Sequence, residues 1–407
     1  MGPDRRPADA AVTAPGSRLL VHDDAIRANT AFFATLTGGR LMAVLKADGF
    51  GHGAVARSVL EAGAGSVGVT SVDEALAVRA EGVRAPVLSW LNPPDADFAA
   101  AVGADVALAV ADPAVLVAVL AAARTVGRAA MVHLHVDVGM AREGGAPADW
   151  AALCSLAREA EGTGAVRVVG VMGHMSSADR PEDDQNRRER LLFENAVRTA
   201  RRRGLTPATV HLAATAATLT GVGEGFDLHR IGAGLFGIDP SGTTDRLRPA
   251  LSLTTAVVSS RSVQAGTRIG YGGTSTTVAP TNLALLPLGY GDGLPRAASG
   301  RAEVLVRGRR CPVVGRFSMD SVVVDTGPER TAPGEPVTVF GPGDGGEPTV
   351  TEWATWAGTI PHELVTRIGS RVARVHRTST STSTSSSSTS SSASTRTRTR
   401  TRTEEHP

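Results

Sequence analysis

The chain has 407 residues, enough for a barrel of about 250 residues and a smaller second domain. Hydrophobic residues make up 42% and charged residues 20%, and no apolar run approaches the roughly 20 residues that cross a bilayer. The formal net charge is only +2, which gives nucleic-acid binding little electrostatic support. Two distant cysteines, Cys154 and Cys311, provide neither a disulfide framework nor a metal site. We therefore expect a cytoplasmic globular protein that binds neither nucleic acid nor membrane and holds no metal.

Residues 1–17 are polar and rich in Pro and Ala, so we expect them to be disordered. From residue 18 to residue 242, short β-branched runs alternate with longer segments of helical period. The predicted strands are 41–45, 67–70, 87–90, 106–110, 132–136, 166–171, 210–212 and 228–231, and predicted helices include 72–82, 113–126, 148–161 and 186–203. Eight strands with intervening helices predict an α/β fold, an N-terminal (β/α)8 TIM-like barrel. The alternative is a doubly wound sheet, which the absence of a G-x-G-x-x-G motif after the first strand disfavours.

The pattern changes beyond residue 242. Segments 251–259, 283–288, 302–306 and 336–340 are short and β-rich, and Gly, Pro and Asp turns separate them. We therefore predict a C-terminal all-β domain over residues 243–377. Residues 378–407 form a Ser/Thr and Arg/Thr tail with nothing apolar to bury, and we expect this tail to be disordered.

One lysine stands out. Lysine and arginine together number 42, and Lys46 is the single lysine. Arginine replaces lysine wherever only a positive charge is needed, but arginine keeps its proton, whereas a lysine amine can lose its proton and attack an aldehyde. Lys46 ends the first predicted barrel strand in AVLKADGFGHG, and barrels of this type build their active site at these strand ends. We expect the glycines that follow Lys46 to bring the backbone close to a ligand.

The segment AVLKADGFGHG resembles the cofactor-lysine motif of alanine racemases. HLHVDVGMAREG, VMGHMSSADRPEDD, HLAATAATL, FDLHRIGAGLFGIDPS, IGYGGT, LALLPLGYGDG, RRCPVVGRFSMD and GTIPHE follow in the family's order, so the resemblance spans roughly residues 19–375. It implies a racemase, most simply of alanine, that uses pyridoxal 5'-phosphate. It also implies a homodimer with shared active sites.

The resemblance assigns the reacting groups residue by residue. Lys46 would carry the cofactor, and Tyr271 would be the second acid/base on the opposite face of the substrate α-carbon. Only two tyrosines occur in the chain, Tyr271 and Tyr290, and both lie in Gly-Tyr-Gly settings. Because a phenol is a poor base near neutral pH, Tyr271 needs a helper, and the family supplies His174 beside Arg230. Arg230 would face the pyridine nitrogen and leave it unprotonated, since arginine gives up no proton.

The remaining roles are also implied by the resemblance. Thr215, Gly232, Ala233 and His362 would hold the phosphate, and Arg142, Tyr290 and Met319 would contact the substrate. The resemblance places Tyr271, Tyr290 and Met319 in the partner subunit's active site.

Several positions depart from the family pattern. Phe50 and His362 replace tyrosines that reach the phosphate, and His135 replaces a lysine, often carbamylated, that orients the arginine matching Arg142. Ala214 and Ser318 replace an asparagine and a cysteine. These changes leave a serine or other small amino-acid racemase, and a non-catalytic cofactor-binding relative, as alternatives. A decarboxylase of the same architecture is disfavoured, because such enzymes have an acidic partner for the pyridine nitrogen where this chain has Arg230.

Overall fold

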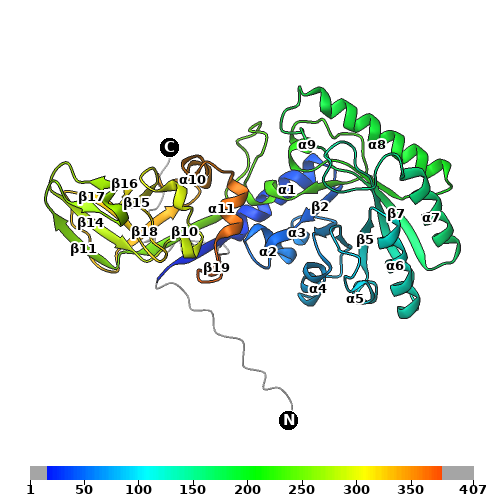
Figure 1. Ribbon diagram of the computed structural model, residues 1–407, viewed down its shortest axis with the longest axis horizontal. Coiled ribbons are helices and arrows are strands. Elements are labelled where there is room, and N and C mark those ends of the chain that lie inside the picture. Colours follow the sequence, from blue (N-terminus) through cyan, green and yellow to red (C-terminus); the bar gives the residue numbers. More distant parts are fainter. Residues whose placement is uncertain (1–15, 378–407) are drawn as a thin grey trace, which may run out of the picture.

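The computed structural model describes residues 16–377 as a barrel and a separate β domain (Figure 1). Residues 1–15 and 378–407, which hold most of the two predicted disordered ends, lie outside the described residues. The prediction of disorder was wrong for Ser17, which is buried and whose Oγ lies 2.8 Å from Oγ1 of Thr255.

The barrel consists of eight parallel strands in the order β8-β7-β6-β5-β4-β3-β2-β9. The strands are β2 Leu41–Val44, β3 Ser66–Val69, β4 Val87–Ser89, β5 Val106–Val110, β6 Ala130–His135, β7 Val166–Met172, β8 Thr209–His211 and β9 His229–Ile231. The two ends of this order meet, because the Arg230 N–H donates to Ala213 O at 2.9 Å and the Asp227 N–H donates to Val210 O at 2.9 Å. The barrel prediction is therefore confirmed.

Helices cover the barrel on the outside (Figure 1). The helices of this part of the chain are α1 Asp23–Leu36, α2 Lys46–Phe50, α3 Ala56–Glu61, α4 Val72–Ala80, α5 Phe98–Gly103, α6 Pro113–Val126, α7 Trp150–Gly162, α8 Asp184–Arg202 and α9 Thr215–Leu219. Of these, the short α2 and α9 lie at the carboxyl ends of the strands and not on the outer surface. Helix α6 shows how the sequence sets the bounds. Asp112 caps its first turn, Pro113 opens it, and Gly127 ends it at φ 73°. Strand β5, Val-Ala-Leu-Ala-Val, is buried throughout, as expected for a parallel strand covered on both faces.

The second domain is built on a nine-stranded sheet in the order β11-β14-β17-β16-β15-β18-β10-β1-β19. The strands are β1 Arg18–His22, β10 Leu251–Ala256, β11 Ser259–Val263, β14 Thr281–Leu286, β15 Glu303–Val306, β16 Arg309–Val314, β17 Val322–Gly327, β18 Pro336–Phe340 and β19 Ala373–Arg377. The short β12 Arg268–Ile269 and β13 Ser275–Thr276 form a separate pair. Two helices, α10 Val350–Ala357 and α11 Pro361–Arg367, complete the domain.

Strand β1, Arg18–His22, lies outside the barrel, although the sequence predicted that the barrel domain begins at residue 18. It pairs antiparallel with β10 and parallel with β19, so it belongs to the sheet of the second domain. Leu19 and Val21 are fully buried there. Burial alternates along β1, with Leu19 and Val21 buried and Leu20 partly exposed, which suits a sheet with one covered face.

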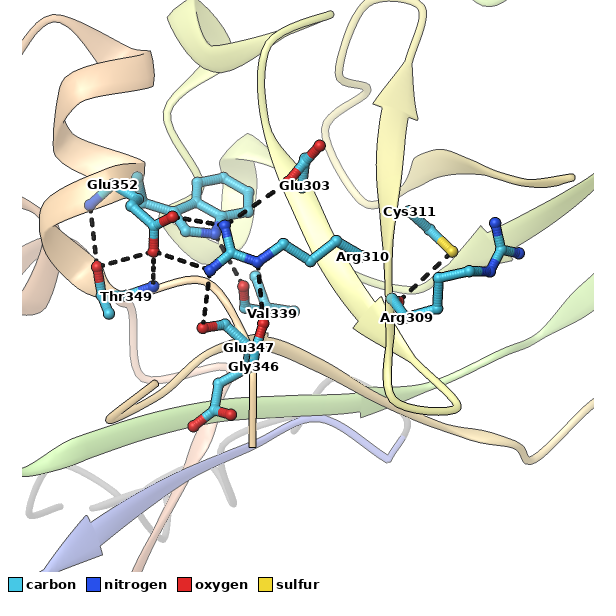
Figure 2. Close-up of polar contacts among 10 residues, drawn as sticks. Glu303, Arg309, Arg310, Cys311, Val339, Gly346, Glu347, Thr349 and Glu352 are labelled. Atoms are coloured by element: carbon cyan, nitrogen blue, oxygen red, sulfur yellow. Dashed lines mark hydrogen bonds and ion pairs between the residues drawn. The ribbon is translucent and has the colours of Figure 1, made fainter. Parts of the chain in front are cut away.

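An arginine on β16 fixes helix α10 in place (Figure 2). Arg310 donates from Nη2 to Glu352 Oε2 at 3.2 Å and from Nε to Gly346 O at 2.9 Å. Glu352 also accepts from the Thr349 N–H at 2.8 Å, while Thr349 Oγ1 accepts from the Glu352 N–H at 3.2 Å. This reciprocal cap holds the first turn of α10. Because α11 follows three residues after α10, the same contacts help to place α11 against the barrel, where its residues line a cavity.

Among residues 16–377, no helix has the length and the apolar character needed to cross a membrane.

Candidate active site

A cavity of about 980 Å³ lies where the carboxyl ends of the barrel strands meet α11. This is the face at which barrels of this kind carry their active sites. Among the residues that line it are those assigned from the sequence to the cofactor and to the substrate within one chain, namely Lys46, Arg142, His174, Thr215, Arg230, Gly232, Ala233 and His362. One chain therefore brings this set together.

Lys46 stands at the start of an unusual turn. Ala47, Asp48, Gly49 and Phe50 all have φ between 54° and 58°, so the chain winds left-handed directly after β2. Non-glycine residues rarely adopt this conformation, and it persists only where the surroundings enforce it. Glu74, on the first turn of α4, supplies one restraint, since its carboxylate accepts from the Ala47 N–H at 2.7 Å and from the Thr70 N–H at 2.8 Å.

The glycines after Lys46 serve packing as well. A Cβ on Gly51 would lie 2.2 Å from Val365 O of α11. Gly51 therefore allows close contact between the turn and α11, and the expectation that the glycines bring the backbone close to a ligand stays a prediction. His52 lies beneath the turn and is buried. Its Nδ1 lies 3.0 Å from both Gly49 O and Phe50 O, so this nitrogen carries the proton and donates.

The environment of Lys46 favours its neutral amine. Burial lowers the pKa of Lys46, and the positive charges of Arg142 and Arg230 lower it further, against an opposing effect of Glu74. A lysine amine must be unprotonated to attack an aldehyde. The neighbours of Lys46 therefore prepare it for covalent chemistry.

Arg230 is buried, and its guanidinium has no carboxylate partner among residues 16–377. Its donors reach Gly173 O at 2.6 Å, Leu212 O at 3.1 Å, and both the carbonyl and Nδ1 of His211 at 2.9 Å. Because a guanidinium only donates, His211 Nδ1 must accept. The His211 proton then sits on Nε2, which donates to His133 Nδ1 at 2.9 Å. Burial lowers the pKa of Arg230 to about 10, so it remains a cation at neutral pH.

The same guanidinium fixes the tautomer of His174. Arg230 Nη2 lies 3.3 Å from His174 Nδ1, which must accept. Burial lowers the pKa of His174 well below its ordinary value, and the charges of Arg230, Arg142 and Lys46 lower it further. The ring is therefore neutral at physiological pH, and its proton lies on Nε2.

The region assigned to the phosphate contains one hydroxyl, two backbone amides and two departures from the family pattern. Thr215 Oγ1 lies 3.3 Å from the N of Gly232. The Phe50 ring packs 5.1 Å from the Phe236 ring and 6.2 Å from the His362 ring, centroid to centroid. His362 Nδ1 is buried and has no hydrogen-bond partner among the described residues. Burial, followed by the charge of Lys46, lowers the pKa of His362.

Arg142 lines the cavity without a hydrogen bond or ion pair to any residue of the described part of the chain. Arg142 lies close enough to Lys46 and Arg230 for its positive charge to lower the pKa of both side chains. Two arginine side chains, Arg142 and Arg230, thus line one cavity beside Lys46, which suits an anionic ligand.

Tyr271, Tyr290 and Met319 do not reach this cavity in their own chain. They lie on the β domain with 69%, 41% and 54% of their surface exposed, and none of them lines the cavity. Tyr271 follows Gly270, whose φ of 69° favours glycine, and Arg268 donates to the Gly272 carbonyl at 2.8 Å. The tyrosine is therefore presented outward on a structured turn.

Sequence reasoning missed three contributors to the site: Glu74, His133 and His211. Glu74 carries a visible signal, because Ser71 and Glu74 have the spacing of a capping box at the start of a predicted helix. His133 and His135 alternate in one strand, so both point to one face of β6. The partner that each of these side chains meets is set by strand neighbours far away in sequence.

Comparison with known proteins accounts for both domains. Residues 21–240 match the alanine racemase N-terminal domain, and residues 250–376 match the alanine racemase C-terminal domain. The chain belongs to the alanine racemase family. The alanine racemase of Frankia casuarinae is 44% identical over 359 residues, which cover 86% of this chain and 94% of the relative.

Solved alanine racemases share the whole architecture. The enzyme from Streptomyces lavendulae is 38% identical, with a TM-score of 0.88 over 90% of this chain and 98% of that chain. The alanine racemase of Bartonella henselae, solved with covalently bound pyridoxal phosphate, is 24% identical and shares the fold, with a TM-score of 0.80 over 89% of this chain and 99% of that chain.

Proposed function

We propose that this chain interconverts L-alanine and D-alanine in the cytoplasm, with pyridoxal phosphate held on Lys46 and with Tyr271 of a partner subunit as the second acid/base. The observation that carries the proposal is the pairing of the single lysine, in a setting that favours its neutral amine, with a buried arginine that has no carboxylate partner among the described residues. Membership in the alanine racemase family supports the assignment of the reaction.

The residues of the cavity fit pyridoxal phosphate. Arg230 offers a donor that cannot protonate the pyridine nitrogen, and Thr215 offers a hydroxyl to the phosphate. The buried, unpartnered Nδ1 of His362 offers a further donor. When bound, the cofactor withdraws electrons from the substrate α-carbon and thereby acidifies its proton. An arginine beside the ring nitrogen makes this withdrawal weaker, which limits side reactions such as transamination.

Lys46 and Tyr271 divide the proton transfer between them. The Lys46 amine acts at one face of the substrate α-carbon, and the Tyr271 hydroxyl acts at the other. Inversion requires one group to remove the proton and the opposite group to return a proton. His174 assists Tyr271: because its Nδ1 accepts from Arg230, its Nε2–H is the group available to the phenol oxygen. A donor at that place stabilises the deprotonated phenol, so a larger fraction of Tyr271 is available as a base near neutral pH.

Arg142 binds the substrate carboxylate as a cation with no competing partner among the described residues. Tyr290 and Met319 line the substrate entrance of the partner's site, as Tyr271 supplies the partner's base. Exposure of these three side chains on the β domain supports a homodimer in which each barrel receives them from the other chain.

Two measurements test the chemistry. Purified protein, reduced with borohydride in the presence of pyridoxal phosphate and then digested, should carry the label on the peptide that contains Lys46. A coupled assay with a D-amino-acid oxidase should detect D-alanine formed from L-alanine. Labelling without any racemisation of alanine or serine would leave a cofactor-binding protein and would refute the enzymatic proposal.

A mixed dimer tests the shared site. Lys46→Ala and Tyr271→Phe variants should each be inactive, but their mixture after subunit exchange should recover activity. Random exchange makes about half of the dimers mixed with one intact site each, so about a quarter of wild-type activity is expected. Absence of recovery, with exchange verified by mass, would place both groups of one site in the same chain.

A further inference from the structure

Hydrogen bonds to backbone groups hold the loop that carries Arg142 at its base and in its first turn, up to the N–H of Ala141, which lies 3.2 Å from Asp137 Oδ2. Its base is closed where the Gly145 N–H donates to His135 O at 2.8 Å and the Asp137 N–H donates to Gly145 O at 3.1 Å. Its first turn is closed by Asp137, whose carboxylate accepts from the N–H of Gly139 at 2.9 Å. Arg142 and its neighbour Glu143 lie between these two restraints, and both side chains face the large cavity.

The absence of an ion pair at Arg142 is notable because Glu143 is adjacent in sequence. A pair between these two side chains would occupy the donors that the substrate carboxylate needs. Glu143 instead lies beside His135, with its Oε1 3.7 Å from His135 Nδ1. The His135 side chain is only 6% exposed, and its Nδ1 is buried without a hydrogen-bond partner among the described residues.

Glu143 also has space to move. It forms part of the wall between the large cavity and a second cavity of about 340 Å³, so it lines both. No hydrogen bond to any described residue holds its carboxylate on either side. The imidazole of His135 is thus the polar group whose contact can set the position of this carboxylate.

We propose that His135 is a positioning residue that holds the Glu143 carboxylate away from Arg142 and thereby keeps Arg142 free for the carboxylate of the substrate. The inference rests on the role of Arg142 proposed above. The His135 ring lies against the Glu143 carboxylate, with Nδ1 3.7 Å from Oε1, which is a polar contact longer than a hydrogen bond. An apolar side chain in its place would remove this contact and release the carboxylate. The Glu143 carboxylate would thus compete with the substrate carboxylate for Arg142, and His135 would prevent this competition.

Four variants of the holoenzyme separate this role from a merely structural one. His135→Leu should raise KM for L-alanine about tenfold, equivalent to about 1.4 kcal/mol, with kcat changed by less than about threefold. His135→Asn, whose amide lies where Nδ1 lies, should keep KM near the wild-type value. Glu143→Gln should leave KM near or below the wild-type value. The double variant His135→Leu/Glu143→Gln should return KM toward wild type, because the competing charge is gone.

A binding measurement provides a readout independent of turnover. The dissociation constant of acetate, a carboxylate probe, followed through the absorption of the bound cofactor, should rise about tenfold in His135→Leu and recover in the double variant. A rise in KM for Glu143→Gln alone, or no recovery in the double variant, would overturn the proposal. Arg142→Ala is the reference: if it leaves KM and acetate binding unchanged, the proposed role of Arg142 fails. If it weakens both while His135→Leu does not, only the present inference fails.

Discussion

The histidine beneath the Lys46 turn makes the protein sensitive to acid in a predictable way. His52 donates from Nδ1 to two carbonyls of the left-handed turn, and its Nε2 is buried without a partner among the described residues. The ring packs 4.2 Å from the Phe236 ring. Protonation of Nε2 would place a cation there with no acceptor, and burial accordingly lowers the pKa of His52 to about 3.

The sign and the magnitude follow from linkage. An unfolded histidine has a pKa of about 6.5, so the unfolded state takes up the proton first as the pH falls. The stability contributed by neutral His52 is therefore complete above pH 6.5 and is lost progressively as the pH falls toward 3. Between neutral pH and pH 5, the free energy of unfolding therefore falls by about 2 kcal/mol because of this one ring.

Urea unfolding at pH 7.5 and at pH 5.0, at one protein and cofactor concentration, measures the effect. His52→Asn keeps a donor near the Nδ1 position but cannot be protonated. The variant should be less stable than wild type at pH 7.5, because it loses the ring contact with Phe236. Between pH 7.5 and pH 5.0, however, wild type should lose about 2 kcal/mol more free energy of unfolding than the variant. Equal losses in both proteins would refute the reasoning.

Three further outcomes are expected. Tyr271→Phe should lower kcat at least about 10²-fold in both directions while the absorption of bound cofactor stays unchanged; retained activity would contradict a second base at this position. Phe50→Tyr should lower the dissociation constant of pyridoxal phosphate about fivefold by adding a donor near the phosphate, measured by fluorescence titration, and an unchanged constant would show that this ring does not face the phosphate. Thr349→Ala should cost about 1 kcal/mol of unfolding free energy through loss of the α10 cap, whereas Thr355→Ala on the exposed face of the same helix should cost less than about 0.5 kcal/mol, both by chemical denaturation.

Local sequence signals specify most of the barrel. Some of its strands, such as β5, are continuous apolar runs, and helices between the strands have recognisable caps, such as Asp112 and Gly127 around α6. Helix α6 was predicted at its observed bounds for this reason, and each predicted barrel strand overlaps an observed strand. The sheet of the second domain was likewise visible in short strands separated by turn residues, but its helices α10 and α11 were not predicted.

Contacts that depend on the tertiary structure could not be predicted from local sequence patterns. Strand β1 precedes a helix, as a first barrel strand would, and only its pairing with β10 and β19 reveals its domain. Gly51 lies in a glycine-rich segment after Lys46, and its close contact with Val365 of α11 could not be predicted from that segment. The sequence also does not indicate that Glu143, which follows Arg142, lies beside His135 at the end of β6.

Strand β1 also determines the order in which the protein can mature during synthesis. The chain leaves the second domain after His22, completes the barrel, and returns at Leu251, so the barrel is inserted between two neighbouring strands of one sheet. Leu19 and Val21 emerge from the ribosome early but must wait for β10 and then for β19 before both edges of β1 are paired. Helix α11, which closes the catalytic cavity, arrives at nearly the same moment as β19. A ribosome-bound chain thus holds a finished barrel well before it holds a finished active site.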